Sequence, residues 1–521
     1  MPSILCALAV DFYKFQFWRV AIEERDSNQT SSNGQSGDTS GWFSRQRVGL
    51  FTGPVVLLVM LLLPPPQDMK LTAWRTAAVG LFMAIWWITE AVPISATALI
   101  PLALLPLLGV VSMADSSAPY ADSIIFLFLG GFIIAAALQR CGLHRRMALS
   151  IIRLVGTRPA NLIAGFMAAT AFMSMWVSNT ATVVMMIPMA LSVLELSENN
   201  ATSEESRSPN LGVAMLLGIA YASSIGGLGT LIGTPPNALL AGFMSKTYKV
   251  EIGFAQWMIV GVPLVLVSLP LCWLLLVRVL YPMRASEIAG GREMIEREVR
   301  ALGRLSHTEV MVGLITITVA LAWIFRPLLA RLIPGLSDTG IAMMGALLLF
   351  LIPVNWRRME FALDWSHAER LPWGVLILFG GGLSLANAIQ KTGLAEWIGE
   401  AMSGFKHLPL LLVTVTVTTV IVFLTELTSN TATAAAFLPI VASLATGMGA
   451  DPLVLAIPAV LGASCAFMLP VATPPNAIVY SSGRLSVPQM ARAGIWLNII
   501  FIVLINIAAF TLVEKAFGTG R

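Results

Sequence analysis

The chain has 521 residues, of which 57% are hydrophobic and only 12% are charged. Soluble domains contain about 25% charged residues, so this composition excludes a soluble dehydrogenase, kinase or nucleic-acid-binding protein. The net charge is +4, but basic residues in such an apolar chain usually record its orientation in a membrane. We therefore predict an all-α integral membrane protein whose partner is the lipid bilayer and not a nucleic acid.

The chain contains four cysteines and four histidines. The cysteines lie far apart without a Cys-x-x-Cys spacing, which argues against a zinc site, an iron–sulfur cluster or a disulfide framework. The histidines all fall at the ends of predicted apolar segments. Metal catalysis is therefore not expected.

Residues 1–47 precede the first apolar span. Residues 1–25 mix charged and aromatic side chains, which predicts an amphipathic helix on the membrane surface, and they lack the cleavage site of a signal peptide. Residues 26–41 are rich in Ser, Gly and Asn, as is typical of a linker. We expect residues 1–47 to form an N-terminal cytoplasmic segment and linker.

From Val48 onward, apolar stretches alternate with short polar breaks. About 11 of them reach the roughly 17–25 residues needed to cross a bilayer as a helix. The predicted transmembrane helices are 48–64, 72–90, 95–112, 121–140, 211–245, 254–282, 308–328, 338–354, 372–390, 453–482 and 492–514. Two further apolar stretches, 160–196 and 409–447, contain Ser-Asn-Thr near the middle, which favours two re-entrant hairpins over two very long helices.

The basic residues support one orientation of these spans. With the N-terminus inside, eighteen arginines fall on the cytoplasmic side and nine Lys or Arg residues on the opposite side, as the positive-inside rule requires. We therefore predict an inner (plasma) membrane protein with a cytoplasmic N-terminus and an external C-terminus.

The two halves of the chain repeat the same motifs. Ser178 and Ser429, which are 251 residues apart, open identical Ser-Asn-Thr-Ala-Thr stretches. Thr-Pro-Pro-Asn-Ala begins at Thr234 and again at Thr473, with an offset of 239 because the first half carries an extra polar loop around 197–210. Chance does not readily produce such a double match, so the chain contains an internal repeat.

Five predicted spans lie between the two Ser-Asn-Thr motifs. Because this number is odd, the second half is inverted in the membrane relative to the first. We expect a first repeat half at 48–306, with an extra first helix and a cytoplasmic-side hairpin at 160–196. The second half is expected at 307–521, with an external-side hairpin at 409–447. Inverted repeats with broken helices are a recurring transporter architecture, with the binding site where the repeats meet.

The repeated motifs offer neutral oxygens and an amide. Ser and Thr hydroxyls and the Asn amide can donate to a carboxylate, and the Asn carbonyl can accept a hydrogen bond or bind a cation. Because no Arg or Lys lies near either triplet in the sequence, we expect monovalent cations such as sodium to balance an anionic substrate. In the alternative interpretation these residues only join helices and the Pro-Pro pairs only kink them, but the duplication favours a binding site.

Two carboxylates, Glu90 and Glu426, lie within apolar sequence. Such an acid is a candidate proton relay or counter-charge for a cation. Both also have a structural interpretation, because Glu90 falls at the end of a span and Met175 occupies the position that corresponds to Glu426. The sequence favours the structural interpretation for each.

The chain resembles the divalent-anion:sodium symporter (DASS) family of di- and tricarboxylate transporters from about residue 48 to 514. The resemblance rests on the paired Ser-Asn-Thr motifs, the paired Pro-Pro-Asn motifs and the stretch from Trp87 to Pro93, Trp-x-Thr-Glu-Ala-x-Pro. It implies an elevator-type transporter, a homodimer in which a transport domain moves against a scaffold domain.

The resemblance also implies roles for individual residues, with Na+ as the co-transported ion. The first sodium site would comprise Ser174, Ser178, Asn179 and the backbone of Gly233. The second would comprise Thr425, Thr428, Ser429, Asn430 and the backbone of Ala472. The substrate carboxylates would be held by Asn179, Thr180, Thr234, Pro235, Asn430, Thr431, Thr473 and Pro474.

These features predict sodium-coupled symport of C4-dicarboxylates such as succinate, malate or fumarate. Sodium-independent exchange, and citrate or sulfate transport on the same scaffold, remain alternatives, although Ser174 and Thr425 favour sodium coupling because each adds an oxygen four residues before its triplet serine. A hydrolase within the membrane would need a nucleophile with an adjacent base, yet no His lies within a span and neither Glu has an evident partner. An enzyme is therefore not expected.

Overall fold

The computed structural model describes residues 45–156, 158–199, 209–283, 291–401, 404 and 407–518. The predicted amphipathic helix at 1–25 and the linker at 26–41 lie outside the described residues. Regular structure in the described part is helical apart from one antiparallel pair of strands, β1 (Pro353–Asn355) and β2 (Glu360–Phe361). The all-α fold predicted from the composition is confirmed.

The helices of the first half follow the predicted apolar segments, except α8 and α14, which lie between them and were not predicted. They are α2 (Arg45–Leu62), α3 (Leu71–Thr89), α4 (Ile94–Thr97), α5 (Ile100–Leu107), α6 (Met113–Ser117), η1 (Ala118–Ala121), α7 (Ser123–Arg140), α8 (Leu143–Val155), α9 (Pro159–Ser174), α10 (Asn179–Asn199), α11 (Pro209–Gly227), α12 (Pro235–Phe243), η3 (Met244–Tyr248), α13 (Phe254–Leu274), η4 (Leu275–Leu280) and α14 (Gly291–Ala301). The stretch predicted as one span at 95–112 is divided into α4 and α5. Pro101 has no N–H to donate to the carbonyl oxygen of Thr97, so one helical hydrogen bond is missing there.

The second half repeats this pattern. Its helices are α15 (His307–Ile324), α16 (Arg326–Leu329), α17 (Asp338–Leu351), α18 (Trp365–Glu369), α19 (Trp373–Thr392), α20 (Leu394–Ala401), α21 (Leu410–Thr425), α22 (Asn430–Gly447), α23 (Leu453–Ala463), η6 (Pro470–Ala472), α24 (Pro474–Ser481), α25 (Val487–Ala508), η7 (Ala509–Val513) and α26 (Glu514–Phe517). Both α12 and α24 begin with Pro-Pro, which is favourable in a first turn because those N–H groups would have no helical partner.

Each Ser-Asn-Thr motif lies where one helix ends and the next begins. The first tip, Met175–Ser178, joins α9 to α10, and the second tip, Glu426–Ser429, joins α21 to α22. The first break, residues 228–234, separates α11 from α12, and the second break, residues 464–473, separates α23 from α24. The interruptions predicted from the sequence are therefore present in both halves.

The outer surface suits a bilayer. In the described part of the chain, nine helices are long and apolar enough to cross a membrane, and five shorter helices are also apolar. Large apolar side chains point outward, among them Phe51 (69% exposed) and Leu266 (67% exposed). Water would disfavour so much apolar surface, whereas lipid tails cover it readily.

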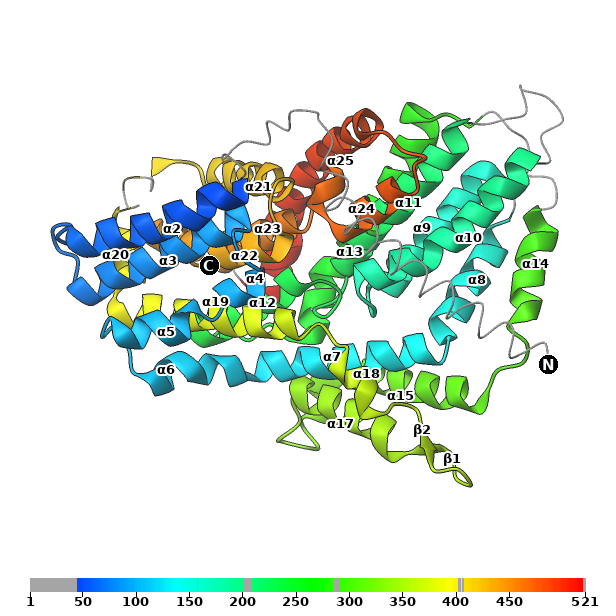
Figure 1. The fold of residues 1–521 in the computed structure, drawn as a ribbon, viewed down its shortest axis with the longest axis horizontal. Helices are drawn as coiled ribbons and strands as arrows, with labels where there is room; N and C mark the ends of the chain where they lie inside the picture. Colours follow the sequence, from blue (N-terminus) through cyan, green and yellow to red (C-terminus); the bar gives the residue numbers. More distant parts are fainter. Residues whose placement is uncertain are drawn as a thin grey trace, which may run out of the picture.

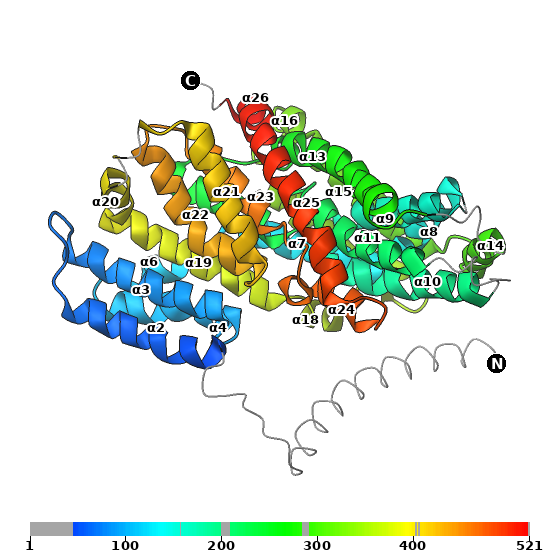
Figure 2. The same cartoon turned by 90° about the horizontal axis from the view of Figure 1, so that it is seen from above.

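The helices form an elongated body. The pair α2 and α3 lies at one end, and α8, α10 and α14 lie at the other (Figures 1 and 2). In the view from above, α25 runs obliquely between the α21–α23 group and the α9–α11 group (Figure 2). One apolar core extends through both groups.

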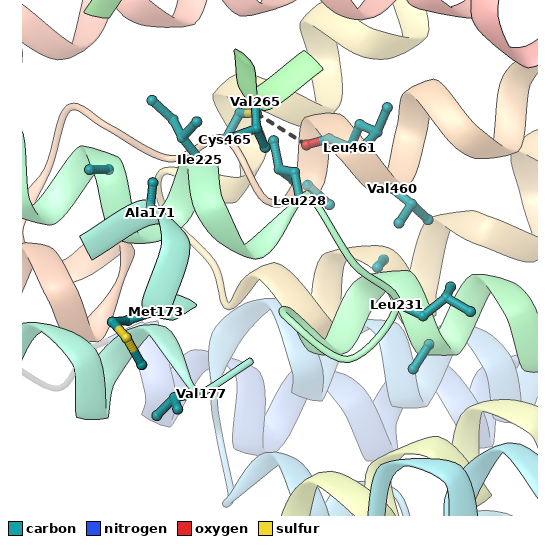
Figure 3. Packing of buried hydrophobic residues seen from close by; sticks show 14 of the residues in the cluster. Ala171, Met173, Val177, Ile225, Leu228, Leu231, Val265, Val460, Leu461 and Cys465 are labelled. Carbon is teal, nitrogen blue, oxygen red and sulfur yellow. Dashed lines mark hydrogen bonds between the residues drawn. The ribbon is translucent and has the colours of Figure 1, made fainter. Parts of the chain in front are cut away.

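The two halves are interlocked around the breaks. Helix α10, which follows the first tip, packs against α11 of its own half and α24 of the other half. Helix α22, which follows the second tip, packs in the same way against α23 and α12. Figure 3 shows the resulting core, in which Leu228 of the first break and Cys465 of the second are both buried. The helix that follows each tip therefore packs against the half-helix that follows the break of the other half.

Candidate functional site

The first tip forms a compact group of oxygens. The hydroxyl of Ser174, which is fully buried, lies 2.6 Å from Oδ1 of Asn179 and 2.7 Å from the carbonyl oxygen of Ser223. A hydroxyl carries one proton, so it can donate to only one of these two acceptors at a time. The tip thus holds three oxygens in close contact with a single donor between them, an arrangement that a small cation would stabilise.

The second tip reproduces this geometry. The buried hydroxyl of Thr425 lies 2.9 Å from Oδ1 of Asn430 and 2.7 Å from the carbonyl oxygen of Ala463. Thr425 and Asn430 are each 251 residues after their counterparts in the first tip. Residues that correspond in the sequence repeat therefore also make corresponding hydrogen bonds in the two tips.

The asparagine of each Pro-Pro-Asn motif forms hydrogen bonds with the backbone of its break. Nδ2 of Asn237 donates to the carbonyl oxygens of Gly227 (3.2 Å) and Thr230 (2.8 Å). Nδ2 of Asn476 donates to the corresponding oxygens, those of Ala466 (3.2 Å) and Leu469 (3.0 Å). Within the described residues, Oδ1 of each asparagine is buried and has no hydrogen-bond partner. Each break therefore contains an unpaired oxygen, which a cation or a water molecule could satisfy.

The first tip and the first break are in direct contact. A Cβ atom added to Gly227 would lie 2.8 Å from Oδ1 of Asn179, and one added to Gly233 would lie 2.5 Å from the carbonyl oxygen of Gly227. Only glycine fits at these two positions. Three members of the predicted first sodium site, Ser174, Asn179 and Gly233, are thereby brought together.

The remaining predicted residues occupy the edges of the tips and breaks. Oγ of Ser178 accepts from the backbone N–H of Ala181 at 3.3 Å, so the exposed Ser178 side chain supports the first turn of α10. In the second tip the hydroxyls of Thr428 and Thr433 are 2.5 Å apart. Ser429 is the residue before α22; its side chain is half-buried and its own backbone is extended.

The predicted substrate residues lie in the first turns of the helices that follow the tips and breaks, or directly before them. Thr180 and Thr431 are half-buried in the first turns of α10 and α22, while Thr234 and Thr473 are buried directly before α12 and α24. Pro235 is half-buried and Pro474 is exposed at the start of the half-helices. Ala472, the backbone ligand expected in the second sodium site, is buried in η6.

Glu426 has a structural role in the second break. Its carboxylate is 3% exposed and accepts hydrogen bonds from the backbone N–H groups of Phe467 (2.7 Å), Met468 (3.0 Å) and Leu469 (3.2 Å). These donors lie in the second break, where the helix no longer satisfies them. The carboxylate thus fixes the backbone of the second break, in agreement with the structural interpretation.

The first break is stabilised without a charge. Met175, at the position that corresponds to Glu426, packs its side chain so closely over Gly229 that a Cβ atom there would lie 2.6 Å from Cε. The Thr230 hydroxyl donates to the Met175 carbonyl oxygen at 2.6 Å. Trp257 Nε1 donates to the Leu228 carbonyl oxygen at 2.9 Å. The two halves therefore differ in how their breaks are supported.

Sequence reasoning missed two residues near the second tip. Asn498 of α25 donates from Nδ2 to Oε1 of Glu426 at 2.8 Å, and its only signal in the sequence is an amide within an apolar helix. Arg45 of α2 donates to the carbonyl oxygen of Leu427 in the second tip. The expectation that no basic residue lies near a tip is therefore wrong. The sequence did not reveal the contact because Arg45 and Leu427 are 382 residues apart along the chain.

The described residues contain no cluster of three or more His, Cys, Asp or Glu side chains that could hold a metal ion. The donors that fit a cation are instead hydroxyl, amide and backbone carbonyl oxygens. Neutral oxygens suit a hard monovalent cation, and the interruption of the helices exposes backbone carbonyls to partners outside the helix.

The fold and this paired site define a membrane transporter built around broken helices. Residues 44–513 match the family described as the sodium:sulfate symporter transmembrane region, and the chain belongs to that family. This confirms the predicted family and the prediction of a transporter rather than an enzyme.

The relatives include proteins named sodium-dependent dicarboxylate transporter SdcS. The protein from Staphylococcus saprophyticus is 43% identical over 480 residues, which cover 91% of this chain and 92% of the relative. The one from Staphylococcus aureus (strain USA300) is 43% identical over 479 residues, with the same coverage. The alignments thus include nearly the whole of both proteins.

Two solved structures share the fold. The YdaH transporter of Alcanivorax borkumensis superposes with a TM-score of 0.51 at 15% identity, covering 84% of this chain and 98% of that chain. MtrF of Neisseria gonorrhoeae, described among antimetabolite efflux pumps, gives a TM-score of 0.56 at 13% identity, covering 91% and 96%. At these identities the likeness concerns the fold alone.

Proposed function

We propose that this protein is a sodium-coupled symporter of C4-dicarboxylates such as succinate, malate or fumarate. The observation that carries the proposal is the duplicated oxygen group, Ser174 with Asn179 and Thr425 with Asn430, each lying against a helix break. The names of the relatives that are 43% identical support both the ion and the class of substrate.

Each oxygen group is proposed as part of a sodium site. Ser174, Ser178, Asn179 and the Gly233 backbone would form the first site. Thr425, Thr428, Ser429, Asn430 and the Ala472 backbone would form the second. The unpaired Oδ1 atoms of Asn237 and Asn476 support this assignment, because a buried acceptor without a donor is costly unless a cation or water satisfies it.

The substrate is proposed to lie between the two tips. Its carboxylates would accept hydrogen bonds from the Asn179–Thr180 and Asn430–Thr431 pairs and contact the Thr234–Pro235 and Thr473–Pro474 turns. Bound sodium would offset the charge of the dianion where these neutral donors cannot. Coupling then follows, because an anion that enters without the cations would leave its charge uncompensated.

Transport is proposed to follow an elevator mechanism in a homodimer. A transport domain holding both tips and both breaks would move against a scaffold domain. The crossed packing of α10 on α24 and α22 on α12 supports a single rigid transport domain. The ion pair of Arg484, after α24, with Glu198, near the end of α10, also joins the two halves.

The membrane arrangement belongs to the same proposal. The repeat halves at 48–306 and 307–521 would be inverted, with hairpin 160–196 opening from the cytoplasm and hairpin 409–447 from outside. The N-terminus would be cytoplasmic and the C-terminus external, in the inner (plasma) membrane. The arginine bias of the predicted cytoplasmic loops supports this orientation.

The deciding experiment is uptake of labelled succinate into proteoliposomes. Accumulation under an inward sodium gradient, and none with choline, is the expected result. Exchange of labelled succinate against internal succinate without sodium would contradict sodium coupling but would still support succinate as a substrate. Uptake of labelled sulfate or citrate, with none of labelled succinate, would contradict the substrate class.

A variant pair tests the tips themselves. Asn179→Ala and Asn430→Ala should each abolish uptake while the protein still reaches the membrane, because each removes a proposed sodium ligand and a substrate donor at once. Asn161→Ala is a matched control, since Asn161 is exposed in the first turn of α9 and outside the tips. Normal uptake by either tip variant would refute the assignment.

A further inference from the structure

The α2–α3 pair is one tightly packed unit. A Cβ atom added to Gly49 of α2 would lie 1.9 Å from Oγ1 of Thr89, and one added to Gly53 would lie 2.6 Å from Nε1 of Trp86. The two helices therefore touch backbone to side chain along this seam. This close packing makes α2 and α3 one structural unit.

A charged pair lies at one end of this unit. Glu90 follows α3 with a left-handed backbone (φ 51°), which turns the chain sharply at the end of the helix. Its Oε2 lies 3.5 Å from Nη2 of Arg45 in the first turn of α2. Glu90 thus orients the Arg45 guanidinium.

The same guanidinium reaches the second tip. Its Nη1 donates to the backbone carbonyl oxygen of Leu427, which lies in the interruption between α21 and α22, where the helix no longer guarantees a partner for it. Arg45 therefore connects the α2–α3 pair to the second tip, two residues from Ser429.

We propose that Arg45, held by Glu90, is a positioning residue that latches the second tip to the α2–α3 pair in one state and releases it in each transport cycle. The inference rests on the proposed elevator mechanism, in which the second tip moves and α2–α3 belongs to the scaffold. It assigns a functional role to Glu90, for which the sequence favoured a structural interpretation.

The exposure of the pair suits a latch rather than a permanent brace. The side chains of Arg45 and Glu90 are 46% and 39% exposed, so water can replace their contacts when they separate. Partly exposed ion pairs are weak, and the contact can break in every cycle. A permanent brace between these parts would instead need buried partners, as Glu426 has in the second break.

Cross-linking tests whether the contact must open. Cysteines are placed at Arg45 and Leu427 in a chain whose Cys6 and Cys141 are replaced, while Cys272 and Cys465 are kept because they are fully buried. Bis-maleimides of increasing length then join positions 45 and 427. We expect cross-linking to abolish sodium-driven succinate uptake relative to the same protein before treatment.

The matched control joins two positions within the α2–α3 pair. Cross-linking Arg45→Cys to Glu90→Cys should leave uptake at its value before treatment, since both positions move together. Full uptake by the cross-linked 45–427 protein would overturn the latch. So would failure of every reagent to join 45 to 427, because the contact would then be absent from the membrane protein.

Kinetics of milder variants separate a latch from a substrate contact. Arg45→Gln and Glu90→Gln should each change the maximal uptake rate by about two- to fivefold, the range that a partly exposed ion pair supports, with the KM for succinate unchanged. Arg45→Lys should recover part of the effect, because it keeps the charge and a donor. Unchanged rates, or a change in KM alone, would overturn the proposal.

These results are distinguishable from failure of the proposed function. The yield of the 45–427 cross-link is measured without any transport. If the wild-type protein shows no sodium-driven succinate uptake, the function fails whatever that yield. If wild-type uptake is normal and the cross-linked protein is equally active, only the latch fails.

Discussion

Asn498 of α25 donates to the same carboxylate oxygen of Glu426, Oε1, that accepts the Phe467 backbone N–H. The second break is thus tied to both the second tip and α25 through one buried carboxylate. Glu426→Gln removes acceptor capacity and turns an NH2 group toward backbone donors. Leaving buried donors unpaired costs roughly 1–3 kcal/mol each, so we expect a clear loss of stability and of uptake.

Thermal unfolding of the purified protein in detergent, with uptake in parallel, measures this effect. Glu369→Gln is the control, because Glu369 is an exposed carboxylate at the end of α18. Asn498→Ala should show a smaller loss, since three backbone donors remain for Glu426. Unchanged unfolding of Glu426→Gln would mean that the carboxylate does not support the break.

The asparagines of the breaks give a second prediction. Asn237→Ala and Asn476→Ala each remove two hydrogen bonds to buried backbone carbonyls. At about 0.5–1.5 kcal/mol for each bond, both variants should lose roughly 1–3 kcal/mol of stability. Because the contacts are equivalent, the two losses should be similar, as measured by denaturant or thermal unfolding. A large loss in only one half would contradict the equivalence of the two breaks.

Much of this architecture follows from the sequence because its signals are local. Apolar length predicts the helices, and Pro-Pro and the triplets predict the interruptions, since a proline pair or polar turn disrupts a helix wherever it occurs. The constant offset of 251 residues is matched by a recurring contact, Ser174 with Asn179 and Thr425 with Asn430.

The residues that escaped prediction act across the fold. Asn498 meets Glu426 across 72 residues, and Arg45 meets Leu427 across 382. No periodicity or spacing marks such a pair, because the packing of distant helices decides it. The first break packs against Met175, whereas the second break is bound by the Glu426 carboxylate. A comparison of the two repeats shows only that these residues differ, and does not predict their contacts.

A third prediction concerns pH at the loop before α18. Asp364 accepts hydrogen bonds from Ser366 and lies 2.8 Å from His367 Nδ1 and 3.3 Å from the Arg140 guanidinium. These groups lower the pKa of Asp364 from the ordinary 3.8 to about 2. Since the folded pKa is the lower one, the stabilisation is present above about pH 4 and is lost as the pH falls toward 2.

Asp364→Asn should therefore unfold at a lower temperature than the wild type at pH 5, and the difference should narrow as the pH is lowered to 3. The expected effect is small because the carboxylate is exposed. Thermal unfolding at both pH values measures it. A difference that widens with acid would mean that the ion contacts of Asp364 do not stabilise the fold.

The hydroxyls before the triplets give the last prediction. In each tip the hydroxyl lies between the Asn Oδ1 and a backbone carbonyl, so its own oxygen is available to a cation while its proton relieves repulsion between the acceptors. Ser174→Ala and Thr425→Ala remove that oxygen and leave the Asn unsupported. We expect the sodium concentration for half-maximal uptake to rise about tenfold, which corresponds to about 1.4 kcal/mol, with a smaller change in succinate KM at saturating sodium. Thr425→Ser keeps the oxygen and should retain near-normal sodium dependence, whereas equal loss in Thr425→Ser and Thr425→Ala would assign Thr425 to packing through its methyl group.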